Sequence, residues 1–223
     1  MKFKTIGYIK TEALLSRRVR INGKITGVIA SKPIHLLKGD SANKLPKPDT
    51  LYIDIGLSDK NEAENVVSVG DRAVIVGDYS EADNKILAKA LDDRIGCAIL
   101  ISLLRNESQY DFYATFTVQE EIGARGAKTA AFGVNPEVSI VLEGTTAADI
   151  AGVTEENTVC KLGEGVAVSF MDRSTVYDRD FYNAAINSGL ACQTKRAVAG
   201  GNNSGAIHLS REGVRTIALS VPC

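Results

Sequence analysis

Acidic side chains at three places in the chain stand where they could act together chemically. The pair Asp92–Asp93 lies where the chain is expected to enter a helix, and the pair Glu120–Glu121 directly follows a strand-like segment. Glu143 directly follows the apolar run VSIVL. Because ligands of an open α/β sheet bind in the crevice outside the carboxyl ends of its strands, we expect these carboxylates to converge.

Converging carboxylates repel one another, so they need a cation, shared protons or wide separation. Carboxylate oxygens suit divalent metals, and zinc, cobalt or manganese become possible when imidazole joins the site. Glu120 and Glu121 are expected to point in different directions as the backbone leaves a strand. One could then bind metal while the other takes a proton from metal-activated water and passes it to a leaving amine. Strand-end acids are also often solvated loop residues, and that alternative stays open here.

The elements that would position these acids alternate between helix and strand from about Ile86 onward. Helical spacing or helix-like composition is found at residues 92–104, 125–132, 179–188 and 203–211. Strand-like runs are found at residues 110–118, 138–142, 166–170 and 214–221. Strands interleaved with helices predict an α/β fold with a partly parallel sheet that is covered by helices.

The first 86 residues have a different pattern. Short β-rich runs separated by turn residues occupy positions 3–9, 18–21, 24–30, 51–56 and 72–77. This pattern is typical of a small barrel or sandwich. Residues 32–50 are predicted to form a long loop because they hold three of the five prolines, and residues 59–67 are predicted to form a short helix. We therefore predict two domains, a small β-barrel-like domain at 1–86 and an α/β domain at 87–223.

Composition excludes several functional classes. The 223 residues carry 26 Lys plus Arg and 27 Asp plus Glu, for a net charge of -1, which argues against binding to nucleic acid or to an anionic membrane surface. No apolar run approaches the roughly 20 residues of a membrane-spanning helix. The opening residues also lack the apolar core of a secretory signal.

The four cysteines have no CxxC spacing. We interpret Cys97, Cys160, Cys192 and Cys223 as free thiols in a reducing compartment, the cytoplasm. A four-cysteine zinc site is the less favoured alternative, because the gaps between these residues are too long for the usual zinc motifs.

Four longer runs closely resemble one protein family. They are KALDDRIGCAIL (89–100), FTVQEEIGARGA (116–127), LGEGVAVSFMDRS (162–174) and AGGNNSGAIHLSREGVRTIALSVP (199–222). These runs resemble the TET-like metallo-aminopeptidases, a family that includes glutamyl aminopeptidase-like enzymes and proteins labelled endoglucanase-like. The run GVIASKPIHLL (27–37), together with LYIDIG (51–56), resembles the inserted barrel domain of the same family.

The resemblance implies specific roles for the acidic residues. It places Asp92 at the carboxylate that bridges two metal ions, Glu120 at the general base and Glu121 at a metal ligand. Glu143 falls where the family has an acidic ligand to the other metal, often Asp. The implied activity is the removal of N-terminal residues from peptides with a pair of zinc or cobalt ions. The implied architecture is a zinc-peptidase-like catalytic domain with a barrel-like domain that mediates homo-oligomers, dimer-based and up to a dodecamer.

The resemblance also implies that the family's ligand histidines lie outside these residues. Relatives carry one in a His-x-Asp element before the position of Met1, and another in an Arg-Tyr-x-His-Ser-Pro-like run after that of Cys223. The chain is therefore expected to be shorter than the family at both ends. We interpret His35 as a loop residue and His208 as a helix-packing residue, not as ligands.

Two further stretches match the family less simply. Asn203 stands where relatives often carry Asp, and residues 200–203 are predicted to form a turn at the pocket rim. A plain Gly-Asn turn that leads into a helix is an equally good interpretation. The run MDRS (171–174) matches the family well, but physical reasoning from the sequence gives it no role.

Three functions follow from these patterns. The first is a metal-dependent aminopeptidase, and the second is a non-catalytic chain that serves only as a folded, oligomerising body. The third is a glycoside hydrolase that uses two carboxylates without metal. The third is disfavoured because aromatic residues make up only 6% of the chain, with no Trp to form a sugar-binding platform.

Overall fold

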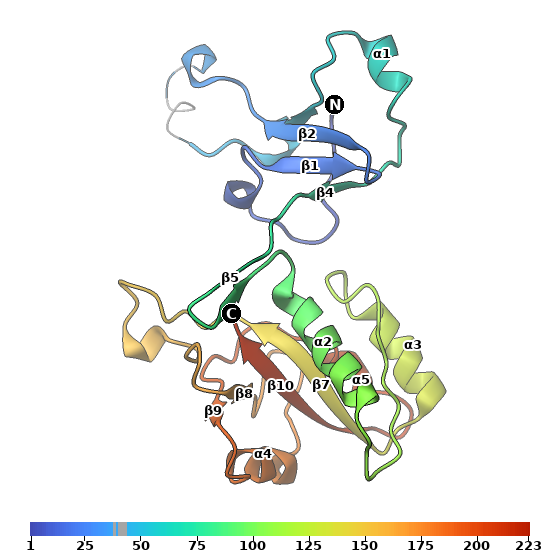
Figure 1. Ribbon diagram of the computed structural model, residues 1–223, viewed down its shortest axis with the longest axis vertical. Coiled ribbons are helices and arrows are strands. Elements are labelled where there is room, and N and C mark those ends of the chain that lie inside the picture. Colours follow the sequence, from blue (N-terminus) through green and yellow to red (C-terminus); the bar gives the residue numbers. More distant parts are fainter. Residues whose placement is uncertain (38, 40–43) are drawn as a thin grey trace. The chain divides into compact units, whose positions relative to one another are not determined.

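A computed structural model describes residues 1–37, 39 and 44–223 of the chain. These residues form two compact units, Met1–Lys89 and Ala90–Cys223, and each is described by itself (Figure 1). Part of the loop predicted at 32–50 lies outside the described residues. None of the helices in the described part is both long and apolar enough to span a membrane.

The unit Met1–Lys89 is built on an open antiparallel sheet with the strand order β3-β2-β1-β4. Its strands are β1 (Arg18–Ile21), β2 (Ile25–Ala30), β3 (Tyr52–Asp54) and β4 (Ala73–Ile75). The predicted barrel is not confirmed, because β3 and β4 form the two ends of this sheet and do not pair with each other in the described part. The run at 3–9, which was predicted as a strand, forms none there either.

Shorter elements complete this unit. The helix α1 (Lys60–Glu64) begins after Asp59, whose side chain accepts hydrogen bonds from the backbone N–H groups of Asn61 and Glu62. A second hairpin joins β5 (Ser80–Ala82) to β6 (Lys85–Leu87). The sequence did not predict this hairpin, because each strand has only three residues, too few to show an alternating pattern. Single 3₁₀ turns lie at η1 (Thr11–Ala13), η2 (Ile34–Leu36) and η4 (Pro48–Thr50).

The unit Ala90–Cys223 contains a mixed sheet with the strand order β7-β10-β8-β9. Its strands are β7 (Val138–Thr145), β8 (Val166–Val168), β9 (Cys192–Thr194) and β10 (Arg215–Pro222). Figure 1 shows β7 beside β10, and these two strands pair in parallel, as do β8 and β9. The pairing of β10 with β8 is antiparallel. The prediction of an α/β fold with a partly parallel sheet is therefore confirmed.

Four α-helices and one 3₁₀ turn accompany this sheet in the described part of the chain. They are α2 (Leu91–Arg105), α3 (Arg125–Val134), α4 (Arg179–Ile186), α5 (Ser204–Ile207) and the turn η5 (Glu155–Asn157). The helix α2 packs on β7, α3 packs on α5, and α4 contacts β8, β9 and β10. The helix predicted at 203–211 is present as a single turn only. It ends at Ile207, and the positive φ angles of Arg211 and Gly213 exclude a regular helix over the last residues of the predicted range.

The strand predicted at residues 110–118 is the main error in this unit. The segment is assigned to no strand. Its aromatic side chains Phe112, Tyr113 and Phe116 are exposed. Apolar spacing indicates a surface that could be buried, but a strand also needs a hydrogen-bonded neighbour, and no described strand pairs with this segment.

Candidate active site

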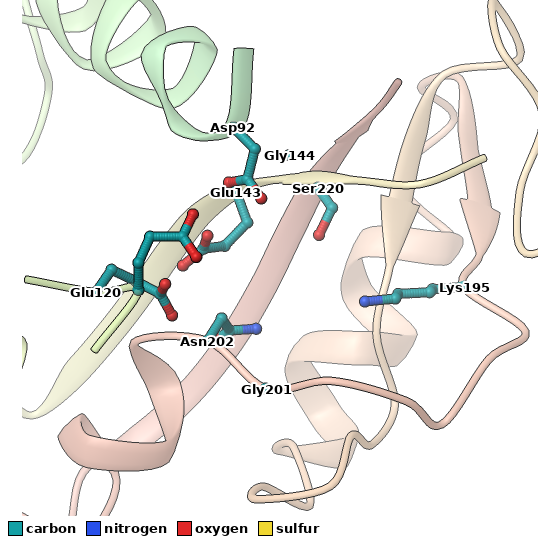
Figure 2. Close-up of a pocket in the computed structure, with 9 residues that line it drawn as sticks. Asp92, Glu120, Glu143, Gly144, Lys195, Gly201, Asn202 and Ser220 are labelled. Carbon is teal, nitrogen blue, oxygen red and sulfur yellow. The ribbon is translucent and has the colours of Figure 1, made fainter. Parts of the chain in front are cut away.

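One cavity of the unit Ala90–Cys223, of about 150 Å³, brings all four predicted site acids together. It is lined by Asp92, Glu120, Glu121, Glu143, Gly144, Lys195, Gly201, Asn202 and Ser220. Figure 2 shows Asp92 entering from the start of α2, Glu143 from β7 and Lys195 from the opposite side. Acids from three separate segments thus share one solvent-filled space, while the individual roles of these residues stay predictions.

The irregular start of α2 directs Asp92 to the cavity. Asp92 and Asp93 have non-helical backbone angles inside the bounds of α2, and the peptide bond between them is cis. Asp93 caps the regular part of the helix, because its Oδ1 accepts a hydrogen bond of 3.0 Å from the backbone N–H of Gly96. A Cβ atom at Gly96 would lie 2.4 Å from Asp93 Oδ2, so a larger residue there would displace the capping carboxylate. Of the two adjacent acids, one caps the helix and the other lines the cavity.

A tight turn places both Glu120 and Glu121 at the cavity. Gln119 has a positive φ of 63°, and the carbonyl of Glu120 accepts hydrogen bonds of 2.9 Å from the N–H groups of Gly123 and Ala124. The expectation that the two glutamates point in different directions assumed a strand, in which side chains alternate. The backbone here turns instead, so that alternation does not apply and both side chains line the same space.

Glu143 is the most deeply buried of the four acids, with 6% of its surface exposed. It lies on β7 next to Gly144, where an added Cβ would come within 2.8 Å of the Cβ of Asp92. Glycine therefore allows the start of α2 to approach β7 closely. The backbone N–H of Asn203 donates a long hydrogen bond of 3.4 Å to Glu143 Oε1.

Several acids at or beside this cavity have raised pKa values. Burial, followed by the negative charges of Asp93 and Asp92, raises the pKa of Glu143 to about 8. Burial also raises the pKa of Asp93 to about 6. The pKa of Glu120 is raised by burial and then by the charge of Glu121. Desolvation raises the pKa of Asp92 as well, although its side chain reaches solvent, and the positive charge of Lys195 acts in the opposite direction.

The donor chemistry of the cavity fits a divalent cation. A positive ion would stabilise the charged carboxylates, whose pKa values are raised by burial first and, for Glu120 and Glu143, also by mutual repulsion. Carboxylate oxygens bind such ions. The buried Oδ1 atom of Asn203, beside Glu143, has no hydrogen-bond partner in the part of the chain that the structure describes. In the same part, no three His, Cys, Asp or Glu side chains are already arranged at the spacing of metal ligands. Side-chain rotation would therefore have to accompany binding.

The remaining lining of the cavity consists of residues that the sequence indicated less clearly. The turn predicted at 200–203 supplies Gly201 and Asn202 to the rim. Lys195 and Ser220 were not predicted as site residues. Lys195 directly follows β9, a strand too short and too polar to be recognised, and Ser220 lies in β10 at its register position opposite Glu143 of β7. Both residues could have been found from the sequence as polar residues near the ends of neighbouring strands.

Neither histidine lines this cavity. His35 is exposed in the turn η2, and His208 ends α5, where its Nδ1 lies 2.8 Å from the carbonyl oxygen of Ser204.

Comparison with known proteins identifies the family to which the chain belongs. The profile of the M42 glutamyl aminopeptidase family matches residues 1–223. A putative aminopeptidase of Acetivibrio thermocellus is 31% identical over 229 residues, an alignment that covers 100% of this chain and 67% of the relative.

Solved structures agree with this match. The TET aminopeptidase of the marine sediment archaeon Thaumarchaeota archaeon SCGC AB-539-E09 has a TM-score of 0.92 and 33% identity, with 99% of this chain and 66% of that chain covered. The TET1 peptidase of Pyrococcus horikoshii, described as assembling into a tetrahedron or a large octahedral shell, has a TM-score of 0.81 and 29% identity. The comparison with TET1 covers 99% of this chain and 68% of that one. The chain thus spans about two thirds of the length of its relatives.

Proposed function

The chain belongs to the M42 glutamyl aminopeptidase family, and on that premise we propose that its acidic cavity is a metal-dependent active site that removes N-terminal residues from peptides. The observation that carries the proposal is that Asp92, Glu120, Glu121 and Glu143 line one cavity. Because the chain spans about two thirds of its relatives' length, the activity is proposed for this site and not transferred from them.

The four acids divide into ligands and a base. Asp92, Glu121 and Glu143 would hold a pair of zinc or cobalt ions, with Asp92 shared between them. Such ions supply Lewis acidity, which lowers the pKa of water and polarises the scissile carbonyl. Glu120 would accept the proton of the attacking water and deliver it to the leaving amine. Its raised pKa supports this role, because a base that must also release its proton works best when its pKa is near the working pH.

The charges of the cavity also suit the end of a peptide. A free amino terminus is a cation, and the acidic side of the cavity would attract it. Lys195, which lies across the cavity from the acids, and Asn202 at the rim would contact the rest of the first residue. A cavity that binds the charged amino terminus of a peptide favours removal of its first residue over cleavage in the middle of the peptide.

We further propose that the protein forms homo-oligomers in the cytoplasm through the unit Met1–Lys89, the part of the chain that the sequence predicts to be barrel-like. Its apolar core and antiparallel strands support an independently folded module, and the TET1 relative is described as able to assemble into a tetrahedron or a large octahedral shell. Sedimentation velocity at micromolar concentration tests this proposal. A dimer or larger species is expected, and a monodisperse monomer would contradict it.

The test of activity uses aminoacyl-p-nitroanilides with added cobalt or zinc, with and without chelator. Glu120→Gln should reduce kcat by roughly a hundredfold or more, the usual contribution of a positioned base. Glu164→Gln is the matched control, because Glu164 is exposed in the same unit and does not line the cavity. It should leave kcat unchanged.

The alternatives predict different results in the same assay. Hydrolysis of glucan that ignores the chelator would support a glycoside hydrolase. Absence of any hydrolysis, together with folding that does not depend on metal, would support a non-catalytic oligomerising body. Metal-dependent peptidase activity that survives Glu120→Gln would retain the function but reject the role of Glu120.

A further inference from the structure

The turn at residues 171–175 contains the MDRS run, for which the sequence alone indicates no role. At its centre Asp172 is 4% exposed. Its Oδ1 accepts hydrogen bonds from Ser174 N at 2.8 Å, Ser174 Oγ at 3.0 Å and Thr175 N at 2.9 Å. Its Oδ2 accepts a short hydrogen bond from the hydroxyl of Tyr177. A buried carboxylate with this many donors is held in one orientation.

The hydrogen-bond network continues from this turn to the rim of the acidic cavity. The side-chain N–H₂ group of Asn202 donates to the Tyr177 hydroxyl at 2.9 Å and to Asp172 Oδ2 at 3.4 Å. The side-chain oxygen of Asn202 accepts from the backbone N–H of Ser204 at 2.8 Å. Asn202 lines the cavity, so the buried pair Asp172–Tyr177 determines how this part of the rim is held.

Backbone contacts and close packing join the same two segments. The N–H of Arg173 donates to the carbonyl of Gly200 at 3.0 Å. Added Cβ atoms at Gly201 and Gly205 would lie 2.9 Å and 2.5 Å from Ser174 Oγ. The loop at 200–205 therefore rests directly on the turn at 171–175, with no space for a larger residue.

The loop is also connected to the acidic side of the cavity. The backbone N–H of Asn203 donates to Glu143 Oε1 at 3.4 Å. Its side-chain N–H₂ donates to Thr117 Oγ1 at 3.3 Å, three residues before Glu120. A displacement of the loop would thus reach both the rim and the segments that carry the acids.

We propose that Asp172 and Tyr177 are positioning residues, which act through Asn202 to hold the loop at 200–203 as the substrate-facing wall of the cavity. This inference rests on the proposed function. It also accounts for a buried carboxylate with which no Lys or Arg forms an ion pair in the described part of the chain. Such a group is less favourable for stability than an apolar one, so a directional role is the physical reason to keep it.

The test begins with Tyr177→Phe, which removes only the hydroxyl. The control is Tyr182→Phe, because Tyr182 is half-buried and its hydroxyl bonds to Thr194 Oγ1 at 2.6 Å and not to a residue of the loop. Amide hydrogen exchange at Asn203 and Ser204 should become about tenfold faster in Tyr177→Phe, the loss of about one hydrogen bond's free energy. It should be unchanged in Tyr182→Phe. Unchanged exchange in Tyr177→Phe would overturn the inference whether or not the protein is an enzyme.

The second readout separates positioning from a purely structural role. In the metal-loaded protein, Tyr177→Phe should raise KM for an aminoacyl-p-nitroanilide about fivefold and leave kcat within about twofold, since the lost contact orders a binding wall. Faster loop exchange with an unchanged KM would show that the network only stabilises the fold, and would overturn the inference. A wild-type chain without hydrolysis would reject the proposed function instead, and exchange would still decide whether Tyr177 holds the loop.

Discussion

The interiors of the two units differ in chemistry. The core of Met1–Lys89 consists of aliphatic side chains: Leu14, Val19, Ile21, Ile29, Leu51 and Ile53. In the part of the chain that the structure describes, every buried polar or charged residue lies in Ala90–Cys223. They include Glu143, Ser169, Asp172, Thr175, Ser204 and Ser220, several of which lie at or beneath the acidic cavity.

This difference shows which unit is organised for stability and which for chemistry. Burial of apolar side chains stabilises a fold without directing any group to a particular point. Buried polar groups cost free energy unless they are hydrogen-bonded, but they fix the orientation of their neighbours. The polar interior of Ala90–Cys223 is therefore expected to lower its stability in exchange for a preorganised site.

The largest effect is expected in the apolar core of Met1–Lys89. Leu51 is 1% exposed, so Leu51→Ala should destabilise this unit by about 3 kcal/mol through lost burial and a residual cavity. Urea unfolding followed by hydrogen exchange would locate the loss. Exchange should accelerate in β1, β2 and β3, while metal affinity at the cavity stays constant. Acceleration that is equal in Ala90–Cys223 would show that the two units unfold as one.

A substitution in the acidic cavity is expected to raise the stability of the protein, whereas Leu51→Ala lowers it. The pKa of Glu143 rises to about 8 from its ordinary value of 4.5, so between these pH values the folded state binds more protons than the unfolded state. The metal-free protein should therefore lose stability as the pH rises from 4.5 to 8. Glu143→Gln should remove part of this loss and stabilise the metal-free protein at pH 8 by roughly 2 kcal/mol. Denaturant titrations across this pH range measure both effects.

Bound metal should reverse the order of stability of the wild type and Glu143→Gln. Added zinc or cobalt should stabilise the wild type at pH 8 but not Glu143→Gln, which has lost a ligand. Glu164→Gln serves as the control, since this exposed glutamate should change neither the pH profile nor the response to metal. A wild-type stability that does not fall with pH would contradict the burial of an uncompensated Glu143.

The smallest effect is expected at Lys195. Its positive charge opposes the rise in the pKa of Asp92 and would repel a bound cation. Lys195→Met should raise the pKa of Asp92 and tighten metal binding severalfold, about 1 kcal/mol for one charge across a hydrated cavity. Calorimetric titration with zinc measures the affinity. Lys161→Met is the control, because Lys161 is paired with Glu155 and does not line the cavity. An equal increase in zinc affinity in Lys161→Met would show that the effect comes from the net charge of the protein and not from the position of Lys195.

The sequence predicted that the four cavity acids lie together better than it predicted the elements around them, and the roles of the acids stay predictions. Asp92, Glu120, Glu121 and Glu143 could be selected because acids that follow strands or begin helices meet at one edge of a sheet. The α/β fold and the helix α2 were predictable from apolar spacing. These signals come from residues close together in the sequence, so they do not depend on contacts with distant parts of the chain.

What the sequence missed depends on contacts between distant residues. The segment at 110–118 has strand-like spacing, but only a pairing partner could make it a strand, and that information is not local. The strand β9 is too short to show a period, so Lys195 after it was overlooked. The role of Asp172 was hidden because its partner Asn202 is 30 residues away, joined to it only by the fold.

The central claim is that the acidic cavity binds catalytic metal, and anomalous diffraction from crystals soaked with zinc tests it most directly. Zinc should give anomalous peaks inside the cavity, with the carboxylate oxygens of Asp92, Glu121 and Glu143 at about 2.0–2.2 Å. Glu120 should lie beside the metal without binding it. An empty cavity at saturating zinc, or zinc bound only elsewhere on the chain, would contradict the account.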